Sequence, residues 1–160
     1  MIDISEKLAR AYELTYKYGW ILSVQRRSGY LDDKANVYKM QLEGELDPLI
    51  KYLTETIQTE LFQHYLDNET PETSKHSTIA RIQRMSDRLK NQSGSLSDRI
   101  VLFQEALNTA HNTGPMSDYL SNVGVTPWYL TDLSSDTNVT RWDDELEKIF
   151  GKKPMMYFED

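Results

Sequence analysis

Apolar residues recur at three- and four-residue steps along almost the whole chain, and this spacing constrains the fold more than any other feature. At the N-terminus one helix face is marked by Ile4, Leu8, Ala11, Tyr18, Ile21 and Leu22. Arg26 and Arg27 followed by Gly29 are typical of a helix end, which predicts a first helix over roughly 4–28. Strand-like alternation of apolar and polar residues is almost absent. The spacing therefore predicts an all-α protein.

A second helix is expected to begin after Asp32 or Asp33 and to run through Val37, Met40 and Leu42. Asp47-Pro48 is typical of a cap followed by the first position of a third helix. The alternative is one long helix kinked at Pro48, because proline removes a hydrogen bond and crowds the preceding turn.

Two further helices are expected on either side of the turn at residues 91–94. One carries Ile79, Ile82, Met85 and Leu89, and the next begins at a capping box formed by Ser95 and Asp98. The last helix is predicted to start near Thr140 and to stop at Gly151, with residues 133–139 as the least regular stretch. We therefore expect a single-domain bundle of about five to seven helices over 1–150, with an irregular C-terminal third and a tail at 151–160.

Cysteine is absent from the 160 residues, which excludes disulfides, thiol nucleophiles and thiolate–metal centres. No apolar run reaches the roughly 18 residues that a membrane span requires. The first residues are acidic and polar, whereas a signal peptide would be basic and then apolar. The composition predicts a water-soluble cytoplasmic protein that contacts no membrane. The motif searches indicate no cofactor.

Charge is unevenly distributed along the chain, whose net charge is -7. Residues 31–72 carry 3 basic and 10 acidic side chains, residues 73–99 carry 6 and 2, and residues 100–160 carry 4 and 10. Within the basic island, Arg81, Arg84 and Arg88 are spaced to project from one side of a helix. Such a row can bind an acidic protein surface, or the phosphates of a nucleic acid as the alternative.

Two His-x-Thr triplets, His76-Ser77-Thr78 and His111-Asn112-Thr113, resemble the tandem signature of two-histidine phosphoesterases. The resemblance covers six residues and implies paired histidines that act as acid and base. It is a remote alternative, because that family places its motifs on strands. Glu60, His64 and Asp67 share one helix face, but a di-iron site needs the Glu-x-x-His motif twice and neither copy exists here, so no metal is predicted.

Aromatic residues are abundant, with ten tyrosines and three tryptophans, and favour a protein that contacts other proteins. The tail carries four consecutive large apolar residues after a Gly-Lys-Lys-Pro break: Met155, Met156, Tyr157 and Phe158. They either fold back on the bundle or insert into a groove elsewhere. We therefore expect a non-enzymatic interaction protein, an assembly, adaptor or regulatory component, in a homo-oligomer or larger complex. A bacteriophage setting, including a virion, would suit such a chain.

Overall fold

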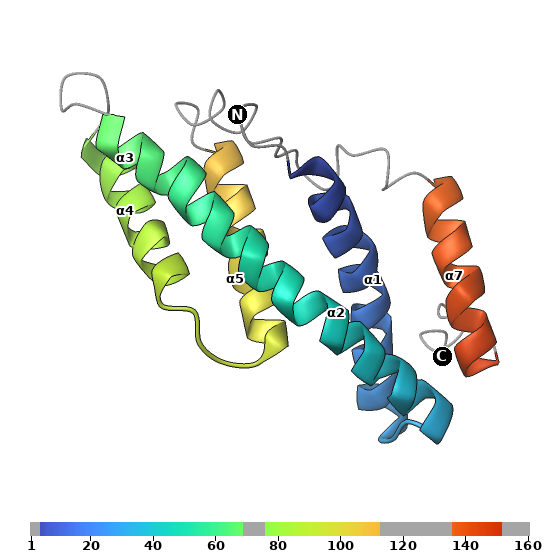
Figure 1. Ribbon diagram of the computed structural model, residues 1–160. Coiled ribbons are helices and arrows are strands. Elements are labelled where there is room, and N and C mark those ends of the chain that lie inside the picture. The colour runs from blue at the N-terminus through green and yellow to red at the C-terminus, as the bar shows by residue number, and fades with distance from the viewer. Residues whose placement is uncertain (1–3, 69–75, 113–135, 152–160) are drawn as a thin grey trace. The chain divides into compact units, whose positions relative to one another are not determined.

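The protein is all-α, as the sequence predicts. The structure, a computed structural model, describes residues 4–68, 76–112 and 136–151, and these contain helices and turns but no strand (Figure 1). The helices are α1 (Ser5–Ser28), α2 (Asp33–Ile57), the π-helix η1 (Gln58–Gln63), α3 (His64–Asn68), α4 (His76–Lys90), α5 (Leu96–Asn112) and α7 (Asp136–Phe150). Segments α2, η1 and α3 follow one another without a break, so the described residues form five continuous helical stretches.

The described residues fall into two compact units. The α4/α5 unit contains residues 4–8, 49–68 and 76–112, and the α1/α7 unit contains residues 9–48 and 136–151. Helices α1 and α2 each contribute residues to both units. The sequence-based division into a 1–150 domain and a 151–160 tail stays a prediction.

Helix α1 confirms the expected first helix. Its apolar face is buried at Leu8, Ala11, Leu14, Tyr18, Ile21 and Val24, and Ile4 just before the helix is buried as well. Gly29 ends the helix with a φ of 82°, a left-handed conformation that favours glycine, and its N–H donates to the Gln25 carbonyl at 2.9 Å.

Helix α2 begins after Asp32, whose Oδ1 accepts a 2.8 Å hydrogen bond from the Ala35 N–H and caps the helix. The helix then continues through Pro48, so the single-helix alternative is right and a separate third helix starting there is wrong. The physical reason is the row of buried residues on both sides of the proline: Leu42, Leu46, Ile50, Leu53 and Ile57. Burial of each such side chain contributes about 1.5–3 kcal/mol, which together outweighs the roughly 3 kcal/mol cost of proline.

The π-helix η1 follows α2 directly and is a feature that the apolar spacing does not reveal. Gln58, Leu61 and Phe62 are buried in it. Gln58 Nε2 donates to Ser86 Oγ of α4 at 3.1 Å, and both side chains are buried. A buried hydrogen bond contributes about 1 kcal/mol, and loss of one partner costs more because the other is left unsatisfied. The π-helix therefore places a polar group that fixes α4.

Helices α4 and α5 confirm the two helices expected on either side of the turn. In the capping box, Ser95 N–H donates to Asp98 Oδ2 and Asp98 N–H donates to Ser95 Oγ, both at 3.2 Å. Gly94 in the turn has a φ of 94°, and a Cβ there would lie 2.6 Å from Asp98 Oδ2. The capping box thus requires glycine at this position.

Helix α7 starts at Asp136, earlier than the predicted start near Thr140, so residues 136–139 are helical and not irregular. An acidic first residue suits a helix N-terminus, where the dipole favours negative charge. The predicted stop is right: Gly151 has a φ of 80° and its N–H donates to the Glu147 carbonyl at 2.7 Å. The sequence also predicts a short helix around Met116 to Ser121, and this segment lies outside the described residues.

Candidate functional site

The basic face of α4, formed by Arg81, Arg84 and Arg88, lies on one exposed side of the helix. All three side chains are exposed, whereas the other side of the helix is buried at Ile82, Met85, Ser86 and Leu89. Because this buried side includes the Ser86 hydroxyl bonded to Gln58, the rotation of α4 is fixed by packing and by a polar contact. The arginines are therefore presented from a firmly held helix.

The three arginines differ in their pairing. Arg88 Nη2 lies 2.7 Å from Glu105 Oε2 of α5, in an ion pair that solvent reaches on both sides. Among the described residues Arg81 and Arg84 form no ion pair. Asp87, the only carboxylate in α4, accepts a hydrogen bond from Gln83 at 2.9 Å. Two guanidiniums of the basic face thus keep their donors directed at solvent.

The other candidate residues predicted from the sequence lie partly outside the described part of the chain. Met155, Met156, Tyr157 and Phe158 lie outside the described residues. His76 begins α4 and His111 lies near the end of α5, so both sit in helices, and not on strands as in two-histidine phosphoesterases.

The Glu60, His64 and Asp67 group does not form a metal site. Asn68 Nδ2 donates to the His64 carbonyl at 2.8 Å, while Gln63 Nε2 donates to Asp67 Oδ1 at 2.9 Å. Across the described part of the chain, no group of three or more His, Asp or Glu side chains is arranged to hold a metal ion. None of the described helices is long and apolar enough to cross a membrane.

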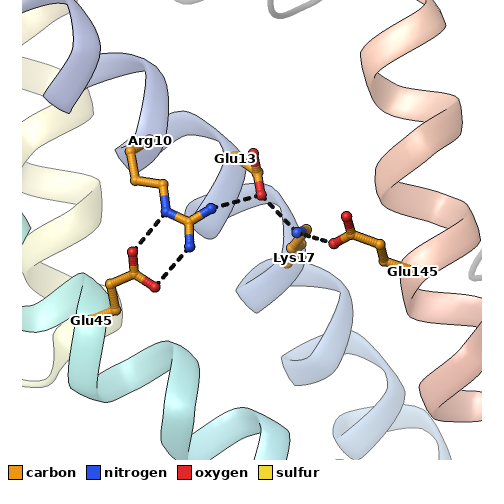
Figure 2. A network of polar contacts seen from close by, with 5 residues as sticks. All are labelled: Arg10, Glu13, Lys17, Glu45 and Glu145. Carbon is orange, nitrogen blue, oxygen red and sulfur yellow. Dashed lines mark hydrogen bonds and ion pairs between the residues drawn. The ribbon is translucent and has the colours of Figure 1, made fainter.

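A network of charged side chains crosses the α1/α7 unit and was not predicted (Figure 2). Arg10 of α1 binds Glu45 of α2 through Nε at 2.7 Å and Nη2 at 2.9 Å, and its Nη1 binds Glu13 at 2.9 Å. Lys17 continues the network, because its Nζ binds Glu13 at 2.7 Å and also binds Glu145 of α7. The network joins three helices of this unit.

Lys17 is the buried member of this network, with only 6% of its side chain exposed. Burial lowers the pKa of Lys17, but hydrogen bonds to Glu13 and Glu145 raise it by more, so the net pKa lies above the ordinary value. The lysine therefore stays charged at neutral pH. A buried cation needs such partners, because burial alone disfavours the charged form. Its spacing to Glu13 was visible in the sequence, whereas its partner on α7 was not.

Aromatic contacts pack α7 against α1 beside the network. Trp142 is fully buried, and its ring centroid lies 5.7 Å from that of Tyr12 and 5.5 Å from that of Tyr16. The Tyr16 hydroxyl donates to Asp143 Oδ1 at 2.8 Å. Burial and then this hydrogen bond raise the pKa of Tyr16 to about 12.

The raised pKa of Tyr16 predicts a loss of stability in strong base. Its folded pKa of about 12 exceeds the ordinary value of 10.0, so the folded chain holds the phenolic proton more tightly and stability falls as pH rises from about 10 to about 12. Urea unfolding at pH 9 and at pH 11 measures this fall. Tyr16→Phe should reduce the fall, and a variant with the full wild-type pH dependence would contradict the contribution of Tyr16.

An exposed apolar face of α2 is a further feature that the sequence reasoning missed. Val37 is 54% exposed and Met40 is 65% exposed, and Gly44 and Pro48 are exposed on the same side of the helix. In the sequence, Val37 and Met40 mark only the course of the second helix. Their angular position around the helix indicates this exposure. At about 100° per residue, both side chains are turned well away from Leu42 and the buried row that follows it.

Comparison of this chain with protein-family models, with characterised proteins and with solved structures finds no match.

Proposed function

We propose that this protein is a non-enzymatic interaction module, an assembly, adaptor or regulatory component of a multi-subunit complex, in the cytoplasm or in a virion. The observation that supports this best is the exposure of Arg81 and Arg84 without ion pairs to other described residues. A guanidinium offers a planar fork of donors that fits a carboxylate, so a row of them on a rigid helix suits an acidic protein surface.

A second copy of this chain is the partner that the charge distribution favours. The segment 31–72 carries 10 acidic side chains, and Glu55, Glu60 and Asp67 are exposed in the same unit as the basic face. Opposite charges on one chain allow the basic face of one copy to meet the acidic side chains of another. The aromatic tail, Met155 to Phe158, is the second proposed contact.

The test is the mass of the protein in solution over a range of salt concentrations. The wild type should assemble at low salt and dissociate as salt rises, because exposed charge pairs are screened. Arg81→Glu/Arg84→Glu should prevent assembly, and mixing it with Glu55→Lys/Glu60→Lys should restore it. Arg26→Glu/Arg141→Glu changes the net charge equally on exposed residues of the α1/α7 unit and is the control.

Assembly that is unchanged by the double reversal would contradict a role for the basic face, and a monomer at every salt concentration would contradict self-association. Removal of residues 152–160 in the same measurement tests the tail. If the truncated chain assembled into the same number of copies as the wild type, the tail would have no role in assembly. Nucleic acid remains the alternative ligand of the basic face. Binding to it should weaken with salt at a log–log slope of roughly -0.9 for each phosphate contact and should be lost in Arg81→Glu/Arg84→Glu.

A further inference from the structure

A polar cavity of about 410 Å³ lies beside the α4–α5 turn within the α4/α5 unit. Three cationic side chains line it, and each comes from a different helix: Lys51 from α2, Lys90 from the end of α4 and Arg99 from α5. Cavities of this size are typical of small-molecule sites. Three positive charges that line one cavity attract an anion.

The wall of the cavity includes a turn whose geometry is fixed. Ser93 and Gly94 line the cavity, and Gly94 is held against the Asp98 carboxylate by its left-handed backbone. The hydroxyl of Ser93 and the backbone of this turn therefore add polar groups to the three cations. Glu55, one helical turn beyond Lys51, adds a single carboxylate to the same wall.

We propose that this cavity binds a small phosphate ester that carries hydroxyl groups, such as a sugar phosphate. A phosphoryl group carries up to two negative charges on three terminal oxygens, so it attracts a cluster of cations more strongly than a simple carboxylate with one charge does. Glu55 repels a bare phosphate, but it accepts hydrogen bonds from hydroxyl groups on the rest of the ligand. None of the arginines of the basic face lines this cavity, although Arg88 lines a neighbouring cavity that shares Ser93 and Gly94 with it.

Titration of the full chain with glucose 6-phosphate, and separately with inorganic phosphate, tests the proposal. Amide NMR shifts of residues 92–99 should report saturable binding of the sugar phosphate. Lys51→Gln/Lys90→Gln should weaken it by about tenfold or more, because two charge-assisted contacts are lost. Arg26→Gln/Arg141→Gln removes the same charge from exposed residues outside the cavity and should leave the affinity unchanged.

Glu55→Gln distinguishes the contribution of the phosphate group to binding from that of the hydroxyl groups. The affinity for inorganic phosphate should rise severalfold, because the repulsion is gone, while the affinity for the sugar phosphate should gain less or fall. Far-UV circular dichroism checks that each variant keeps its helices. The proposal is overturned by absence of saturable binding, by equal weakening in the control variant, or by tighter binding of a single-stranded oligonucleotide at the same amides.

Discussion

Trp142→Ala is expected to destabilise the protein by about 3–5 kcal/mol, the range for removal of a large buried aromatic side chain. Trp142 is fully buried against Tyr12 and Tyr16. Its indole N–H has no hydrogen-bond acceptor among the described residues, so the substitution removes packing without leaving a polar partner unsatisfied. The cavity that remains accounts for the large effect.

Urea unfolding followed by circular dichroism measures this loss, and hydrogen exchange over residues 141–150 locates it on α7. Arg141→Ala alters the neighbouring exposed residue and should stay within about 0.5 kcal/mol of the wild type. If Trp142→Ala lost less than about 1 kcal/mol, the tryptophan would not be a core residue and the packing of α7 on α1 would be wrong.

Lys17→Ala is expected to destabilise the protein by about 2–3 kcal/mol. Loss of one partner from a fully buried ion pair costs about 3–5 kcal/mol, but Glu145 is 46% exposed and can turn to water, which lowers the cost. Glu13 also keeps Arg10 as a partner at 2.9 Å. The loss therefore combines missing packing of the lysine stem with a weakened charge network.

Lys17→Met separates these two contributions, because methionine keeps an apolar stem of similar length and removes only the charge. Its loss in free energy of unfolding should be smaller than that of Lys17→Ala but still measurable by urea unfolding. If Lys17→Met were as stable as the wild type, Lys17 would contribute packing alone, and its ion pairs with Glu13 and Glu145 would add no net stability.

The local sequence predicts the helices well because their ends depend on neighbouring residues. Gly29 and Gly151 stop helices, and Ser95 with Asp98 starts one, each through contacts within a few residues. The course through Pro48 could only be offered as an alternative, because the outcome depends on how much apolar surface is buried on both sides. Tertiary burial decides that outcome, and a local signal does not.

The candidate sites are less predictable because they combine residues that are far apart in the chain. Arg81, Arg84 and Arg88 share one helix, so their common exposure follows from the helical period. Lys17 and Glu145 are 128 residues apart, and no spacing in a single sequence relates them. The proposed sugar-phosphate site likewise combines Lys51 and Arg99 from different helices. Their charges are visible in the sequence, but their proximity is not.

The π-helix after Ile57 affects where a residue can be deleted from the long helix. A π turn closes its hydrogen-bonded ring over one residue more than an α turn. If one exposed residue, Thr59 or Glu60, is deleted, the segment can form an ordinary α-helix. Ile50 and Tyr65 then keep facing the same core. A one-residue deletion in α2 would instead rotate everything beyond it by about 100°. The segment Gln58–Gln63 is thus the place where the long helix can absorb the loss of a residue.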